Sequence, residues 1–571
     1  INLPEVAHQY DNRTETDRFI TSGTVNYRPF TWMRHRFTAG LDYQSPLASI
    51  FYDPSSAFAQ GDFPSGFFAQ RTPQTRYLTF DYAGTLSNTL PAAFTSEFTV
   101  GAQGIKNRTR TVTATATGLP SGDFRLIQAA TTVVATSGFS GQASLGYYAQ
   151  EQIGWNNRLF VTGAIRADDN SAFGARFDRV FYPKASVSYV LSEEPALGAL
   201  FERLRFDNFK LRYAYGQAGR APLPFAALRN YGSARVVTGG GSVVSGLVPG
   251  APGNETLEAE RGIESEVGFD ASLLNSRVSI EATYYSKRTE DALVGVSNAP
   301  STGFTGQRFI NFGTIKNAGL ELGIRTTPIQ RRSVTWDAGV NFTTIDNKMV
   351  RLAVGGVDQI IPFNPYVPSA FPAQIIKEGY PVASFWAVDV RRNADGSYVT
   401  TPSGAFVFDT VNGQPSRHVG SALPTYEGGI TNTVTLFRNL RLYALIDFKG
   451  GHYIFNQRER NRNQAANRNS ALFNDPSHPD FPRTALDTAY WGSNATAPWI
   501  QPADFVKLRD VSASYTLPEG VARRLRVQSA TLVVAGNNLG FLGKRYPGID
   551  PEVNFFGQGT LNFIGNFASF I

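Results

Sequence analysis

Hydrophobic and polar residues alternate with a period of two along much of the chain. One such segment begins at Ile263 and has Val267 and Phe269 among its apolar positions. A second segment begins at Val278, directly after the turn Leu274–Arg277. A period of two is typical of β-strands, because successive side chains point to opposite faces of the sheet. The two segments therefore predict a long antiparallel hairpin.

The register of this hairpin predicts which side chains share a face. If these strands belong to a barrel that spans a membrane, four apolar side chains are expected to face lipid together: Val267, Phe269, Val278 and Ile280. The carboxylates of Glu266 and Glu281 are then expected to face the lumen of that barrel. A register slip of one residue would invert both sets.

The alternation recurs along the chain and predicts roughly 16 to 18 strands. Three long connections are expected at Phe51–Gln74, Arg351–Pro381 and Asn456–Pro502. Short turns on one side and long loops on the other are typical of outer-membrane barrels, in which closure leaves no sheet edge unpaired in hydrocarbon. The sequence therefore predicts an all-β protein, a transmembrane antiparallel β-barrel. A soluble all-β protein such as a propeller is the alternative, but the chain shows no repeat of roughly 40 to 50 residues.

Composition narrows the class of protein further. Hydrophobic residues make up 42% of the 571 residues, and no apolar run reaches the roughly 18 residues of a membrane-spanning helix. Helical membrane proteins are thereby excluded. The chain has no Cys, which removes disulfides and thiolate metal ligands. The net charge of +7 is spread along the chain and favours acidic partners or lipid headgroups over nucleic acid.

The sequence shows no motif typical of an enzyme or a metal site. No P-loop or G-x-S-x-G motif occurs. The histidines are scattered and form no metal-binding pair: His8, His35, His418, His452 and His478. We therefore expect no enzymatic activity, no catalytic residues, no metal and no cofactor.

Aromatic residues and arginines concentrate in or next to the two longest expected loops. The aromatic side chains suit stacking on sugar faces or packing of the loops, and both interpretations stay open. The arginine run Arg458–Arg468 is interpreted as a solvated loop or one bound to lipopolysaccharide phosphates, with ligand binding as the alternative. The candidate ligand or partner contacts are Phe363, Tyr366, Phe371, Trp386, Arg458, Arg460, Arg462, Trp491 and Trp499.

A series of short motifs runs along nearly the whole chain. The earlier ones are Arg166–Gly174 (RADDNSAFG), Tyr182–Ser188 (YPKASVS), Phe209–Gly219 (FKLRYAYGQAG) and Leu257–Glu260 (LEAE). The later ones are Asn311–Leu322 (NFGTIKNAGLEL), Lys377–Trp386 (KEGYPVASFW), Phe505–Val511 (FVKLRDV), Asn537–Leu539 (NNL) and Tyr546–Asn554 (YPGIDPEVN). In this order they resemble the motifs of SusC/RagA-type TonB-dependent outer-membrane transporters, and the last motif is the most specific.

The resemblance implies that residues 1–571 form most of a barrel of roughly 22 strands. Family members carry an N-terminal plug, a TonB-contacting segment and the first strands before the point that matches Ile1, so we expect the chain to lack these parts. Asp169 and Asn170 depart from the family's motif. Residues Asn562–Ile571 either form the last strand of the barrel or end before that strand begins. We favour the second interpretation.

The function implied by the resemblance is energised import of an oligosaccharide or a peptide across the bacterial outer membrane. The expected partners are a SusD-like lipoprotein, outer-membrane lipid, and the TonB–ExbB–ExbD complex acting through the N-terminal part. One alternative is a siderophore- or cobalamin-type receptor, which works without the lipoprotein. Another is a plugless barrel with a structural or scaffold role. A complete upstream sequence would separate them, because a plug with a TonB-contacting segment favours transport.

Overall fold

The protein is almost entirely β-structure in the computed structural model. Seventeen strands of the described residues belong to one large antiparallel sheet, in agreement with the roughly 16 to 18 strands that alternation predicts. In the same part of the chain, no helix combines the length and apolar composition needed to cross a bilayer. The described residues are 10–54, 65–122, 125–174, 179–239, 241–296, 298–304, 306–352, 359–360, 373–382, 384–397, 399–402, 407–411, 414–415, 417–456, 497–548 and 550–552.

Contacts divide the chain into two compact units. Unit 1 comprises residues 1–185, 216–260 and 295–311, and unit 2 comprises the rest. In unit 1 six strands follow one another, each antiparallel to the next: β1 (Tyr10–Phe30), β2 (Met33–Tyr52), β3 (Phe67–Leu90), β4 (Phe94–Thr117), β5 (Thr132–Trp155) and β6 (Leu159–Asn170). The next two strands have residues in both units: β7 (Val180–Val190) and β8 (Phe206–Arg220).

The two faces of the unit 1 sheet differ in chemistry. Phe80 and Leu145 lie on one face and are exposed in the isolated chain, as expected of side chains that contact lipid. The opposite face is polar. There Arg166 donates hydrogen bonds to Gln103 Oε1 at 3.1 Å and to Asp168 Oδ1 at 2.8 Å. The period-two pattern is thus expressed as one apolar and one polar face.

A second antiparallel series lies mainly in unit 2, with a few terminal residues of its first three strands in unit 1. Its strands are β11 (Glu260–Leu273), β12 (Val278–Val296), β13 (Arg308–Gln330), β14 (Val334–Thr344), β15 (Asp346–Leu352), β22 (Tyr426–Leu436), β23 (Leu440–Gly450), β26 (Phe505–Thr516) and β27 (Thr531–Lys544). Strands β14, β22, β23, β26 and β27 pair in this order, β13 pairs with both β14 and β15, and β11 pairs with β12.

The hairpin predicted from the sequence is confirmed at the level of single residues. Strand β11 ends at Leu273 and β12 begins at Val278, so the turn consists of the four predicted residues. Ile280 pairs with Ala271 and therefore shares a face with Val267 and Phe269, and Val278 joins them through its pairing with Leu273. Glu281 pairs with Asp270 and lies on the opposite face with Glu266.

The loop predicted at Phe51–Gln74 is too long, because β3 begins at Phe67. The aromatic residues that suggested a loop instead pack between strands. The rings of Phe51 and Phe68 meet edge to face at 6.0 Å and are buried with Ala116. The loop prediction is therefore wrong for Phe67–Gln74, which belong to β3.

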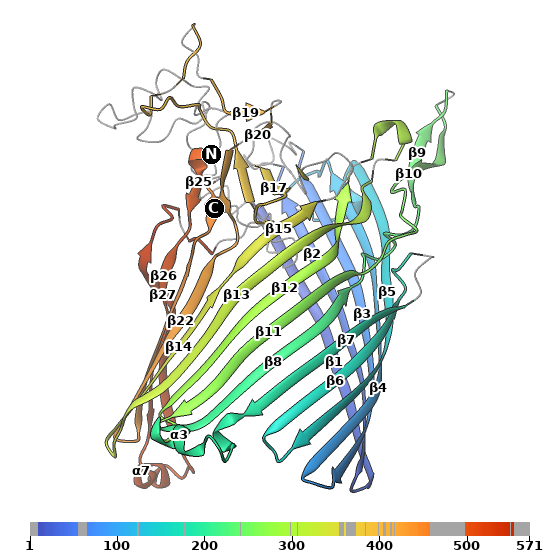
Figure 1. The fold of residues 1–571 in the computed structure, drawn as a ribbon. Coiled ribbons are helices and arrows are strands. Elements are labelled where there is room, and N and C mark those ends of the chain that lie inside the picture. The colour runs from blue at the N-terminus through green and yellow to red at the C-terminus, as the bar shows by residue number, and fades with distance from the viewer. Residues whose placement is uncertain are drawn as a thin grey trace, which may run out of the picture. The chain divides into compact units, whose positions relative to one another are not determined.

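Shorter elements lie outside the large sheet. Ten short strands form small sheets: β9 (Tyr231–Val237) with β10 (Val243–Pro249); β16 (Gln359–Ile360), β17 (Ala373–Lys377), β18 (Ser384–Ala387) and β21 (Arg417–Ser421); β19 (Thr410–Val411) with β20 (Gln414–Pro415); and β24 (Tyr453–Phe455) with β25 (Ile500–Pro502). The short helices are η1 (Ile127–Ala129), η2 (Leu191–Glu193), α3 (Gly198–Arg203), η3 (Pro300–Thr302), η5 (Ala497–Trp499) and α7 (Glu519–Arg524). Within unit 2, β17 and β25 lie at the loop end of the strands, and α3 and α7 lie at the turn end (Figure 1).

Candidate functional site

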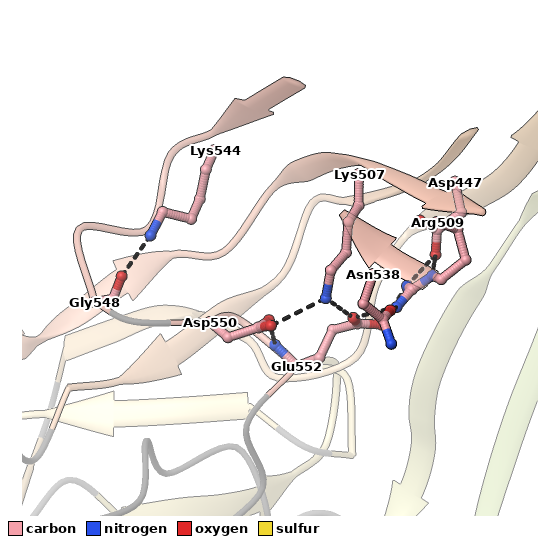
Figure 2. A network of polar contacts seen from close by, with 8 residues as sticks. All are labelled: Asp447, Lys507, Arg509, Asn538, Lys544, Gly548, Asp550 and Glu552. Atoms are coloured by element: carbon pink, nitrogen blue, oxygen red, sulfur yellow. Dashed lines mark hydrogen bonds and ion pairs between the residues drawn. The ribbon is translucent and has the colours of Figure 1, made fainter. Parts of the chain in front are cut away.

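The segment after β27 is tied to the sheet by charged side chains, which we call the ionic clasp: Asp447, Lys507, Arg509, Asp550 and Glu552 (Figure 2). Asp447 of β23 and Lys507 of β26 are directly paired positions. Arg509 sits at a β-bulge and has no paired residue in β23. Bulges redirect side chains at the ends of sheets, and this one lies where β26 meets the segment after β27.

Each cation of the clasp bridges two carboxylates. Lys507 Nζ donates to Asp550 Oδ2 at 3.0 Å and to Glu552 Oε2 at 2.8 Å. Arg509 binds Glu552 with both terminal nitrogens, at 2.9 and 2.8 Å, which is the strong bidentate arrangement of arginine and carboxylate. Arg509 Nε also donates to Asp447 Oδ2 at 3.1 Å. Figure 2 shows Lys507 and Arg509 converging on Glu552.

Burial and local turns stabilise the clasp. The Lys507 side chain is only 7% exposed, so its charge needs the carboxylate partners. Burial opposes ionisation of Glu552, but hydrogen bonds from Arg509 and Lys507 outweigh it and lower the pKa of Glu552 to about 2. The backbone N of Glu552 donates to Asp550 Oδ1 at 2.9 Å and closes a tight turn. Glu552 therefore stays ionised at neutral pH.

The chemistry available to the clasp is anchoring. Both carboxylates that follow β27 are engaged by cations, so neither is placed to act as a general base or a metal ligand. Nearby, Tyr546 is buried with Ile454 and Ala503, which adds apolar packing to the ionic contacts. The described ranges contain no cluster of three or more His, Asp or Glu side chains suited to a metal ion.

A second feature, the aromatic cluster, surrounds Trp386 at the loop end of unit 2. The Trp386 ring meets Tyr380 edge to face at 4.8 Å and lies 5.4 Å from the ring of His418. Lys377 Nζ sits 5.1 Å from the centroid of the Trp386 ring, within cation–π range. Trp386 is 5% exposed, and its indole nitrogen has no hydrogen-bond partner among the described residues. Burial lowers the pKa of His418, which favours its neutral form.

Two of the nine predicted contact residues, Trp386 and Trp499, are described, and both are buried. Trp499 belongs to an apolar cluster with Phe385 and Phe455, and Phe385 directly precedes Trp386 in β18. Burial favours packing over stacking on sugar faces for these two residues. Seven predicted contacts lie outside the described residues: Phe363, Tyr366, Phe371, Arg458, Arg460, Arg462 and Trp491. A contact with ligand or partner stays a prediction for all nine.

Sequence reasoning identified the motifs of the clasp without joining them. Phe505–Val511 supplies Lys507 and Arg509, and Tyr546–Asn554 supplies Asp550 and Glu552. The available signal was complementary charge: two cations alternate in one motif and two carboxylates alternate in the other. Asp447 carries no such signal, because it is a lone carboxylate in a strand that also holds Arg441 and Lys449.

Long antiparallel strands, faces that differ in polarity and short turns at one end define an outer-membrane type of β-barrel. Comparison with known proteins identifies the family. The family model described as TonB dependent receptor-like, beta-barrel matches residues 2–539, and the chain belongs to this family. The family is a class of receptors and transporters.

Individual relatives agree with this assignment. TonB-dependent receptor P26 of Formosa agariphila is 27% identical over 455 residues, which are 76% of this chain and 45% of that protein. TonB-dependent receptor SusC of Bacteroides thetaiotaomicron is 24% identical over 441 residues, which are 72% of this chain and 41% of that protein. The chain thus spans less than half the length of these relatives.

The likeness to solved structures concerns the fold. The RagAB peptide importer in its closed-closed state has a TM-score of 0.79 at 18% identity, covering 99% of this chain and 61% of that chain. The outer-membrane transporter YddB of Escherichia coli has a TM-score of 0.54 at 12% identity, covering 93% and 60%. The expected fold, a TonB-dependent transporter barrel of the SusC/RagA type, is confirmed.

Proposed function

We propose that the whole protein imports a nutrient across the bacterial outer membrane with energy from the TonB–ExbB–ExbD complex. The observation that carries the proposal is the family match over residues 2–539, combined with the likeness to the RagAB peptide importer over 99% of the chain. The barrel forms the wall of the passage in this proposal. Energy coupling is assigned to an N-terminal plug, as in the SusC/RagA family.

The proposed cargo is a peptide or an oligosaccharide. The likeness to the RagAB peptide importer supports a peptide as cargo. The aromatic residues of the predicted long loops support an oligosaccharide, because aromatic rings stack on sugar faces. Trp386 and Trp499 are buried at the loop base, so in this proposal they hold the loops in position. Direct cargo contact is assigned to the predicted contacts outside the described residues.

The proposed partner is a SusD-like lipoprotein that covers the loop end of the barrel. The SusC relative and the RagAB structures support it, and arginines and aromatic side chains are common anchors of protein interfaces. The loop end also has a firm base, because the aromatic cluster and the ionic clasp both lie there. A lid that opens and closes needs such a base on one side.

The experiment is extraction of the full-length protein from its native membrane in mild detergent, followed by mass spectrometry. We expect a lipoprotein at a ratio of one to one with the barrel. Repeated recovery of the barrel alone would contradict the lid and favour the siderophore-type alternative. Mass spectrometry of small molecules retained by the complex then distinguishes peptide from oligosaccharide cargo.

A further inference from the structure

The turns at one end of unit 2 form a continuous row. We call this row the arginine rim and define it as residues 202–207, 274–277, 331–333, 437–439 and 519–527. Its segments are joined by backbone hydrogen bonds. Leu274 N donates to Arg205 O at 3.1 Å, and Phe437 N donates to Ser333 O at 2.8 Å.

Two further backbone hydrogen bonds connect the rim to neighbouring strands. Thr327 N of β13 donates to Arg277 O at 2.8 Å, and Thr516 N of β26 donates to Asn439 O at 2.9 Å. Since each turn is fixed to the next strand or turn, the side chains of the rim face one environment together. Figure 1 shows α3 and α7 at this end of the strands.

The rim is strongly basic. It contains nine arginines, all exposed, against the three acidic residues Glu202, Asp207 and Glu519. Within the described residues, only Arg523 of the nine forms an ion pair, with Glu519 at 3.4 Å. The other eight are Arg203, Arg205, Arg277, Arg331, Arg332, Arg438, Arg524 and Arg526. Such a surplus of cations calls for an anionic partner.

Large apolar side chains are interleaved with these arginines. Leu525 stands between Arg524 and Arg526 and is 58% exposed, and Phe437 precedes Arg438 and is 73% exposed. Ala522 of helix α7 is buried, whereas Leu525 directly after the helix is exposed. Exposed apolar and cationic side chains on one short helix or turn are typical of segments that lie at a membrane interface.

We propose that the arginine rim binds the phosphate groups of anionic glycerophospholipids in the periplasmic leaflet of the outer membrane. Short turns of outer-membrane barrels face the periplasm, and the rim continues directly from the strands of unit 2. The guanidinium group matches phosphate oxygens in a bidentate manner. Leu525 and Phe437 enter the boundary between headgroups and acyl chains. A soluble polyanion would use the arginines but leave these apolar side chains in water.

The test uses the full-length protein in detergent, titrated with phosphatidylglycerol and followed by native mass spectrometry. The variant Arg524→Gln/Arg526→Gln should bind phosphatidylglycerol roughly thirtyfold more weakly. Each cation near an anionic surface strengthens binding by roughly five- to sixfold, and this variant loses two of them. The variant Arg524→Lys/Arg526→Lys keeps the charge and should retain most of the affinity. Higher salt should reduce the difference between wild type and the Gln variant.

The matched control is Arg235→Gln/Arg392→Gln, which removes the same charge from exposed positions outside the rim. It should leave phosphatidylglycerol binding unchanged. Heat-dependent gel migration reports whether each variant contains a folded barrel. Equal affinity in wild type and the rim Gln variant, or an equal loss in the control, would overturn the proposal. So would a rim variant that loses binding to purified lipid A as much as to phosphatidylglycerol, since lipid A belongs to the other leaflet.

Discussion

Glu552 accepts hydrogen bonds from both cations of the ionic clasp and joins a segment beyond β27 to β26. The Glu552→Gln variant keeps the side-chain size but removes the charge that Lys507 and Arg509 share. We expect the segment from Lys544 to Glu552 to exchange amide hydrogens roughly tenfold faster, since charge-assisted hydrogen bonds contribute about 1.5–3 kcal/mol each and part is retained by the amide. Hydrogen-exchange mass spectrometry of the full-length protein measures this.

The clasp should also depend on pH in a defined window. The pKa of Glu552 falls from 4.5 for an unperturbed glutamate to about 2 in the folded state. Its contribution to stability is therefore complete above about pH 4.5 and is lost as the pH falls toward 2. Hydrogen exchange, corrected for intrinsic rates, should be unchanged from pH 8 to 6 and accelerate below pH 4.5. Glu519→Gln is the control, because Glu519 is 89% exposed and its loss should not alter this segment.

Trp386 allows the packing role to be tested at a single position. Trp386→Ala removes a ring that contacts Tyr380, His418 and Lys377, and replacing a buried aromatic residue by alanine costs about 3–5 kcal/mol. We expect faster proteolysis of the loops in this variant while the barrel stays folded. Trp386→Phe should show a much smaller change. Unchanged proteolysis in Trp386→Ala would contradict the packing role.

At the scale of elements, the β11–β12 hairpin offers a test of membrane contact. Its register is fixed, and Ile280 lies on the apolar face with Val267 and Phe269. Replacing Ile280 by Arg should lower the free energy of unfolding by roughly 2–4 kcal/mol if the residue lies near the middle of the bilayer. Urea unfolding in liposomes measures the difference.

The neighbouring position supplies the control for this experiment. Ser279 pairs with Ser272 on the face that carries Glu281, so Ser279→Arg places the same charge on the polar side of the same strand. Its effect should be much smaller than that of Ile280→Arg. Equal costs for the two variants would mean that the two faces do not differ in environment.

The same hairpin shows what can be predicted from sequence. Alternation fixed its turn and its faces because both depend on neighbours within one segment. The start of β3 at Phe67 was missed, since the packing of Phe68 on Phe51 joins different strands. The ionic clasp was missed for a similar reason: Lys507 and Glu552 are 45 residues apart in sequence. Interactions between distant segments require the fold before they can be recognised.

At the scale of the whole molecule, the relatives are longer than the part of them that this chain matches. The chain matches 41–45% of the length of its SusC and P26 relatives, and the structural match to the RagAB peptide importer covers 99% of the chain. The barrel can therefore be assigned from the chain itself. Energy coupling and cargo choice stay proposals, whose tests use the whole protein.

Uptake of cargo should depend on energy in intact cells that express the whole protein. We expect labelled peptide or oligosaccharide to bind at the surface and to accumulate inside only when the proton gradient is intact. The physical reason is that the proposed plug closes the barrel until TonB pulls on it, so that binding precedes a step that consumes energy. A protonophore should abolish accumulation and leave surface binding unchanged. Uptake that continues at full rate would indicate a passive pore, and binding without any uptake would support the scaffold alternative.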